Sequence, residues 1–105
     1  MDSYRDLLQQ IRSHLAHYSV PLWPTRLDDW LRELDRVDPE QLRAHLLRTR
    51  KALGGMGSIA DVVICPQAGH DIPNDMPTIK AANDKLLKLV DELDREVTRE
   101  LSGLT

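Results

Sequence analysis

Residues 77–101 read PTIKAANDKLLKLVDELDREVTREL, and they carry the strongest structural pattern in the chain. Apolar side chains recur in this stretch at a period close to 3.5 residues, which is the spacing of one face of an α-helix. We expect Asn74 or Asp75 to cap this helix and Pro77 to enter its first turn. Ser102-Gly103 is expected to end it. The predicted inward stripe consists of Ile79, Ala82, Leu86, Val90, Leu93, Val97 and Leu101, widened by Leu87 and Leu89.

Three shorter helical patterns precede this stretch. The first covers about 2–18 and is stopped by prolines at positions 21 and 24, because proline has no amide hydrogen to donate. The second is expected to start near Thr25, as its N-cap. The third covers about 39–53, because Asp38 suits an N-cap and Pro39 the first helical position. The residues expected to face inward are Tyr4, Leu7, Leu8, Ile11, Leu15 and Tyr18 in the first helix, Leu27, Trp30, Leu31 and Leu34 in the second, and Leu42, Leu46, Leu47 and Leu53 in the third.

A glycine cluster separates the third and fourth helical patterns, where residues 53–63 read LGGMGSIADVV. Gly54 or Gly55 is expected to supply a left-handed cap for the third helix. Residues 59–65 are either a short buried strand or one or two helical turns capped by Ser58. We favour a helical turn running into extended chain, because a lone strand has no ladder partner. The prediction is an all-α, four-helix bundle-like single domain over 1–105, with an irregular Gly/Pro-rich insert that includes a short extended segment at 61–65.

Composition and charge narrow the function classes. The chain has 105 residues, 41% of them hydrophobic and 30% charged, with a net charge of −3, which is an ordinary globular balance. Its one cysteine, Cys65, excludes an intramolecular disulfide. The sequence shows neither a signal peptide nor a membrane span, so we expect a cytoplasmic protein that does not bind membranes. The acidic balance argues against nucleic acid, and residues 54–105, with nine acidic and five basic side chains, favour a cationic partner.

The glycine cluster fails as a phosphate-binding loop. No lysine follows Gly57, as a phosphate loop requires, and no strand precedes the cluster, as a dinucleotide-binding fold requires. We therefore interpret the cluster as a helix stop and a backbone crossing that positions Ser58 and Asp61. On the polar face of the last helix we expect Asp91 to pair with Arg95. The same i, i+4 spacing predicts a pair between Asp28 and Arg32.

Metal binding and nucleophilic catalysis are the chemical alternatives. His14 and His17 lie on one side of the first helix, and Cys65, His70 and Asp71 are the loop residues that would complete a site of three or four ligands. Their spacing matches no zinc signature. Cys65 with His70 lacks a third residue to orient the base. The sequence therefore predicts no catalytic residue, no metal and no cofactor.

Residues 54–61, GGMGSIAD, resemble a central GGMGS-x-N-D-like motif of a family of small uncharacterised bacterial proteins. A tryptophan followed by leucines precedes that motif, and an apolar run and a polar-faced helix follow it. The matching positions here are Trp30-Leu31, Leu34, Val62-Val63-Ile64, Asn83 and Leu86. Ala60 stands where the family often has Asn. The family has no assigned activity, and by size and compactness it is similar to immunity proteins of bacterial toxin systems.

The resulting hypothesis is a protein-binding module, most concretely an immunity-type protein that occludes the active site of a basic toxin domain. Its predicted contact surface consists of Gly55, Gly57, Ser58, Asp61, Asp71, Asp75, Asp91, Glu92 and Asp94. One alternative is a metal-binding protein or small enzyme that uses the His, Cys and Asp side chains of the central loop. Another is a homodimer joined through the excess leucines of the last helix.

Overall fold

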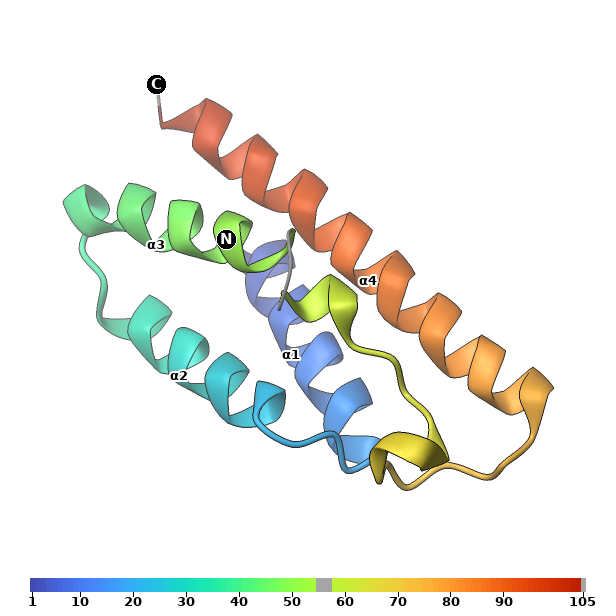
Figure 1. Cartoon of the computed structure of the whole chain (residues 1–105). Helices are drawn as coiled ribbons and strands as arrows, with labels where there is room; N and C mark the ends of the chain where they lie inside the picture. The colour runs from blue at the N-terminus through green and yellow to red at the C-terminus, as the bar shows by residue number, and fades with distance from the viewer. Residues whose placement is uncertain (55–57, 105) are drawn as a thin grey trace.

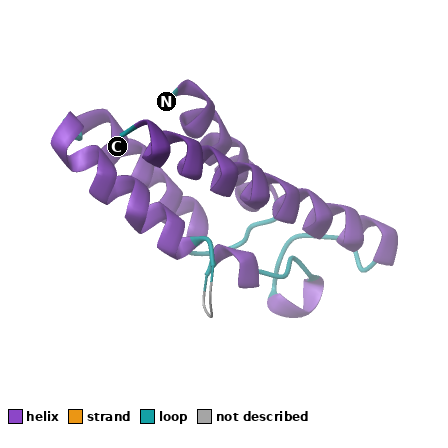
Figure 2. Ribbon diagram, turned by 90° about the horizontal axis from the view of Figure 1, so that it is seen from above, coloured by secondary structure: helices purple, strands orange, loops and turns teal. Residues whose placement is uncertain are grey.

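A computed structural model describes residues 1–54 and 58–104 of the chain (Figure 1). Four α-helices make up most of it: α1 (Asp2–His17), α2 (Trp23–Arg36), α3 (Pro39–Ala52) and α4 (Met76–Gly103). Two short 3₁₀ turns, η1 (Ile59–Asp61) and η2 (Pro66–Ala68), lie between α3 and α4. No strand occurs among the described residues (Figure 2). The all-α prediction and the four predicted helices are confirmed.

The helix α4 sets the length of the molecule. Its 28 residues span about 42 Å at the usual rise per residue, and the molecule measures 46 × 25 × 21 Å. The helix α1 packs against both α2 and α4, whereas α3 packs along the C-terminal half of α4 (Figure 1). The segment from η1 to η2 runs beside the N-terminal half of α4. The loop elements therefore gather on one side of the helices (Figure 2).

Two of the predicted caps are confirmed. The N–H of Gln41 donates to Asp38 Oδ1 at 3.0 Å, and the N–H of Thr78 donates to Asp75 Oδ2 at 3.1 Å. Each carboxylate satisfies an amide that has no partner inside its helix and complements the positive end of the helix dipole. These starts were predictable because capping depends only on residues three positions apart.

The predicted N-cap of α2 at Thr25 is wrong, because the N-cap is Leu22, three residues earlier. The helix begins at Trp23, with Pro24 in its first turn, where no amide donor is needed. Leu22 makes the turn into the helix with φ of +73°, in the left-handed region. Trp23 is buried and its ring meets that of Trp30 edge to face, with 6.3 Å between centroids. Burial of this indole anchors the helix start.

The predicted left-handed cap at Gly54 is also wrong, and Gly55 lies outside the described residues. Leu53 closes α3 in the right-handed region, with φ of −85° and ψ of −15°, and its N–H donates to the Arg50 carbonyl at 3.2 Å. The Leu53 side chain is buried in the core. Because that apolar anchor already turns the chain, no left-handed residue is required at position 54.

The core is a single cluster of apolar side chains from all four helices and the loop. Two predicted inward leucines are exposed instead, Leu47 by 43% and Leu87 by 51%. On α3 the buried face carries His45 and Thr49 in addition to Leu46. Full burial of one leucine side chain stabilises the fold by about 1.5–3 kcal/mol. The stabilisation lost by exposing Leu47 must therefore be offset by the contacts that His45 and Thr49 make in the core.

Those polar side chains form a buried hydrogen-bonded network. The hydroxyl of Tyr4 on α1 lies 2.8 Å from His45 Nε2 and 2.7 Å from Thr49 Oγ1. His45 Nδ1 lies 3.3 Å from Glu33 Oε1 on α2, and Glu33 also pairs with Arg48. Burial raises the pKa of Tyr4 to about 12 and lowers the pKa of His45. A neutral imidazole can therefore donate to Glu33 and accept from Tyr4, which ties α1, α2 and α3 together.

Residues 58–65 form one helical turn followed by extended chain. After η1, Val62 has φ of −68° and ψ of 126°, and Cys65 has φ of −160° and ψ of 154°. The amide of Asn83 on α4 holds this segment: it accepts from Ile64 N–H at 2.8 Å and donates to the Ile64 carbonyl at 2.9 Å. A side-chain amide thus replaces the neighbouring strand that the extended chain lacks.

Candidate functional site

The predicted acidic residues lie in two separate groups. Asp71 and Asp75 are close to the start of α4, and Asp75 uses its carboxylate as the helix cap. Asp91 and Asp94 lie near the middle of α4, and the 16 residues from Asp75 to Asp91 correspond to about 24 Å along the helix. Glu92 is half-buried beside the second group. The acidic residues of the predicted contact surface therefore form two groups, separated by about 24 Å along α4.

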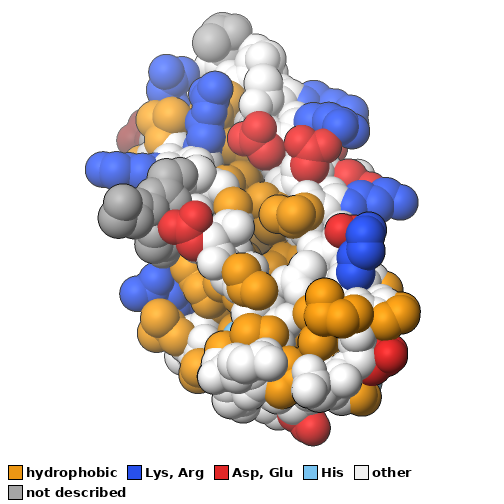
Figure 3. Space-filling view, turned by 45° about the vertical axis from the view of Figure 1, so that its right-hand side comes forward, with side chains coloured by type: hydrophobic (Ala, Val, Ile, Leu, Met, Phe, Trp, Pro, Cys, Tyr) orange, Lys and Arg blue, Asp and Glu red, His pale blue; other side chains and the backbone are white. Residues whose placement is uncertain are grey.

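The middle group lines a groove between the end of α3 and α4. This groove has a volume of about 500 Å³ and is lined by Arg50, Leu53, Gly54, Leu87, Val90, Asp91 and Asp94. Leu87, Asp91 and Asp94 share one face of α4, because they are three and four positions apart. On the face drawn in Figure 3, acidic side chains lie directly beside an apolar patch. The structure thus brings the acids of α4 to Gly54, the first residue of the glycine cluster.

Ion pairs reduce the charge available in part of this groove. Asp91 pairs with Arg95, as predicted. Asp94 forms no ion pair with any residue that the structure describes, so its charge is available to a partner. Elsewhere the predicted pair of Asp28 with Arg32 is wrong: Asp28 pairs with Arg12 of α1 at 3.0 Å. That contact depends on how α1 packs on α2, which local spacing does not encode.

The remaining predicted contact residues differ in accessibility. Gly55 and Gly57 lie outside the described residues. Ser58 is only 6% exposed, and its Oγ is the one buried side-chain oxygen or nitrogen without a hydrogen-bond partner in the part of the chain that the structure describes. Asp61 is exposed at the end of η1. Of these four, only Asp61 is seen to present its side chain to solvent.

The side chains of the metal and nucleophile alternative do not converge. Within residues 1–54 and 58–104, no three His, Cys, Asp or Glu residues are placed to hold one metal ion. His70 Nδ1 accepts a hydrogen bond from the backbone N–H of Cys65 at 3.1 Å. That ring nitrogen is therefore occupied by the backbone and is unavailable as a base for the Cys65 thiol.

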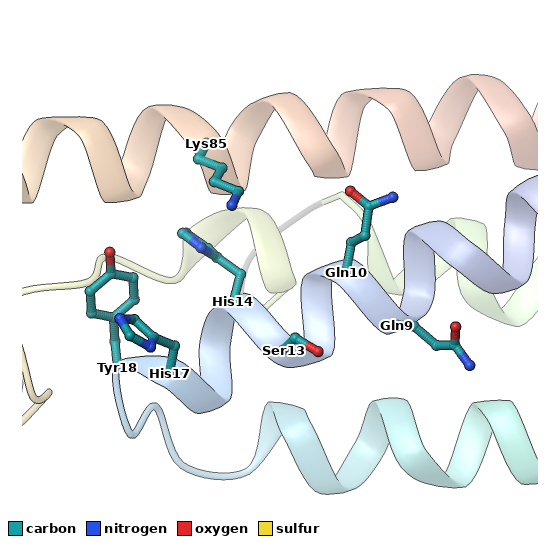
Figure 4. Close-up of a pocket in the computed structure, with 7 residues that line it drawn as sticks. All are labelled: Gln9, Gln10, Ser13, His14, His17, Tyr18 and Lys85. Carbon is teal, nitrogen blue, oxygen red and sulfur yellow. The ribbon is translucent and has the colours of Figure 1, made fainter.

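His14 and His17 lie in a second groove, between α1 and α4 (Figure 4). His14 is 7% exposed and its Nε2 lies 2.8 Å from the Ala82 carbonyl of α4. Tyr18 meets both imidazole rings edge to face, with centroid distances of 5.2 and 4.7 Å. Burial is the main cause that lowers the pKa of His14. Lys85 of α4 joins these residues, and sequence reasoning did not single it out.

Sequence reasoning also missed the role of Asn83. Besides its two bonds to Ile64, Asn83 Nδ2 donates to the Ile79 carbonyl at 2.8 Å. A signal was present, because an amide beside an apolar helical stripe requires hydrogen-bond partners. Its partner was not identifiable, since Ile64 is 19 residues away in the chain.

Comparison with known proteins supports a likeness to an uncharacterised family. Residues 23–73 match a family model described as "Domain of unknown function (DUF6966)". This range covers α2, α3, η1 and η2 and ends before α4. Searches of curated proteins and of solved structures gave no match. Among the described residues, no helix combines the length and the apolar character that crossing a membrane requires.

Proposed function

We propose that this chain is a small protein-binding module, and in its most specific form an immunity-type protein that blocks the active site of a cognate bacterial toxin. The observation that carries the proposal is the groove between α3 and α4, where the exposed Leu87 lies beside Asp91 and Asp94. An apolar centre with a charged rim is the usual anatomy of a protein–protein interface. No catalytic group is needed for such a role.

The charge of the groove favours a basic partner. Residues 54–105 carry nine acidic and five basic side chains, so their long-range field attracts cations. Asp94 forms no ion pair with a described residue, although Arg50 lines the same groove, and Asp91 pairs with Arg95. Complementary charge raises the association rate and selects the partner more than it raises affinity. A basic enzyme cleft is the occupant that fits this surface.

The two acidic groups of the predicted surface differ in how well they can be tested. Reversing Asp75 would remove the cap that holds Thr78 and would disturb the start of α4. Reversing Asp94 removes no hydrogen bond or ion pair to a described residue. Asp94→Arg is therefore the variant that separates partner binding from folding.

The test uses the protein encoded by the gene directly adjacent to that of this chain. Its affinity is measured by calorimetry for the wild type, for Asp94→Arg and for a matched control, Asp6→Arg, which makes the same charge change on the exposed face of α1. We expect Asp94→Arg to weaken binding about tenfold or more and Asp6→Arg to change it less than about twofold. Equal affinities for the two variants, or no binding by the wild type, would contradict the proposal.

A second copy of the chain is the competing occupant of this face. Most leucines of α4 are buried in the core, which leaves Leu87 as the exposed one within the groove. Sedimentation of the wild type and of Leu87→Asp distinguishes the two occupants. A dimer that Leu87→Asp dissociates would assign the groove to self-association and would contradict the proposed function.

A further inference from the structure

The groove between α1 and α4 is polar and contains no carboxylate. It has a volume of about 510 Å³ and is lined by Gln9, Gln10, Ser13, His14, His17, Tyr18 and Lys85. A volume of this size is within the range of small-molecule sites. The lining offers a cation, two imidazoles and two amides, in a chain whose net charge is −3. This local excess of donors indicates a site for an anion.

The lysine of this groove has no counter-ion among the residues that the structure describes. Lys85 is exposed on α4 and forms no ion pair with a described residue. Figure 4 shows its side chain reaching from α4 toward the His14 ring, while Gln10 reaches toward α4 from the other side. The positive charges of Lys85 and His17 both help to lower the pKa of His14. Three groups that can carry positive charge therefore line one groove.

His14 presents a nitrogen to this space whose role changes with protonation. Because a carbonyl oxygen only accepts, His14 Nε2 must be the donor in its 2.8 Å contact with Ala82. In the neutral ring Nδ1 is then an acceptor. Nδ1 has no hydrogen-bond partner among the described residues. It is also not one of their fully buried atoms, so solvent can reach it. Protonation turns Nδ1 into a donor while the bond to Ala82 is kept.

We propose that this groove binds the phosphate group of a small soluble ligand, held by Lys85 Nζ and by protonated His14 Nδ1–H, with His17 adding charge. Lysine and histidine act as single-point donors, and a lysine point charge is a common way for proteins to hold phosphate without the fork of an arginine. The groove has no arginine. The site lies apart from the groove between α3 and α4 and does not depend on the proposed partner.

This assignment makes anion binding pH-dependent with a definite sign. His14 takes up a proton from solvent when the anion binds, so affinity rises as pH falls and weakens about tenfold per pH unit where the free ring is neutral. The charged groups that face His14 are Lys85 from α4 and His17 from its own helix. On the side of α2, Arg12 and Asp28 form an ion pair, so together they add no net charge near His14. Asp71 bonds through its N–H to the Tyr18 carbonyl at 2.8 Å but does not line the groove.

The proposal is tested by following the His14 ring by NMR while sulfate is added at constant ionic strength. Sulfate keeps its charge across the histidine range, so the pH dependence reports on the protein, and inorganic phosphate is the second probe. We expect saturable binding that raises the pKa of His14. We expect Lys85→Gln to weaken it about fivefold and the matched control Lys51→Gln, on the exposed surface of α3 outside this groove, to change it less than about twofold.

Three results would overturn the proposal. The first is a shift of the His14 ring that does not saturate, and the second is an equal effect of the two lysine variants. The third concerns the source of the phosphate: binding to vesicles containing phosphatidic acid that Lys85→Gln abolishes would assign the groove to a lipid headgroup instead of a soluble ligand.

Discussion

Replacement of Asn83 by alanine is expected to destabilise the fold although the residue lies on a helix, where alanine is the better helix former. The side-chain amide makes three hydrogen bonds: to the N–H of Ile64 at 2.8 Å, to the Ile64 carbonyl at 2.9 Å and to the Ile79 carbonyl at 2.8 Å. The Ile64 side chain is fully buried. Without Asn83, the two backbone groups of Ile64 have no replacement partner within the described residues.

The magnitude follows from those two groups. Leaving a buried polar group unpaired costs about 1–3 kcal/mol, and the segment is partly accessible to water, so we take the lower half of that range for each. Alanine returns about 0.6 kcal/mol of helix propensity at position 83. The Ile79 carbonyl adds little, because it lies within the hydrogen-bonded ladder of α4. We expect Asn83→Ala to lower the free energy of unfolding by about 1.5–3.5 kcal/mol.

Urea unfolding measures this loss, with Lys88→Ala as a matched control on the exposed face of α4 that is expected to stay within about 0.5 kcal/mol of the wild type. Hydrogen exchange of the Ile64 amide gives a local readout. We expect protection in the wild type and its loss in Asn83→Ala. A stability change below about 0.5 kcal/mol in Asn83→Ala, or an Ile64 amide that exchanges freely in the wild type, would refute the reasoning.

Other predictions concern the buried network, the histidines and one glycine. Tyr4→Phe removes the hydroxyl that bonds to the buried His45 and Thr49, and it should lower the free energy of unfolding in urea by about 1–3 kcal/mol. A change smaller than about 0.5 kcal/mol would show that the network does not contribute to stability. Burial lowers the folded-state pKa values of His14 and His45 below their ordinary value of 6.5, so the unfolded chain binds protons more readily. Stability should be complete above about pH 6.5 and should fall as pH drops from there toward the folded-state pKa values; a flat urea midpoint between about pH 5.5 and 7.5 would contradict this. Gly69 has φ of +82°, so Gly69→Ala should cost about 1 kcal/mol, whereas Gly103→Ala, at the end of α4 with open space around it, should be neutral or stabilising; the reverse order of thermal midpoints would refute the assignment.

The elements that could be predicted from the sequence are those fixed by local contacts. The caps at Asp38 and Asp75 were correct because each involves an amide three residues away. The stripe of α4 was largely correct because helical periodicity depends on neighbours in the chain. The rotation of each helix about its own axis was less predictable, since it depends on which other elements pack against that helix. Leu47 and Leu87 were expected inside and are exposed. For Leu47 the reason is that α3 turns His45 and Thr49 inward, where they bond to Tyr4.

The candidate sites were predicted only in part, because they join residues that are distant in the chain. Asp91 and Asp94 were identified as contact residues, but their neighbours at the end of α3 follow from tertiary packing. By contrast, the separation of about 24 Å between Asp75 and Asp91 follows from their 16-residue spacing along the predicted last helix. Lys85 and His14 line the same groove although they are 71 positions apart in the sequence. Helical periodicity predicts which residues share a face of one helix, whereas tertiary packing determines which faces of different helices contact each other.

The central claim is that the groove between α3 and α4 binds a basic partner protein, and the association rate tests it most directly. The rate constant for the product of the adjacent gene is measured by stopped flow with Asp94→Arg and with Asp6→Arg, at low and at high ionic strength. The claim predicts that Asp94→Arg slows association several-fold at low salt, and that the difference between the two variants shrinks as salt screens the charges. Indistinguishable rates for the two variants at low salt would contradict it.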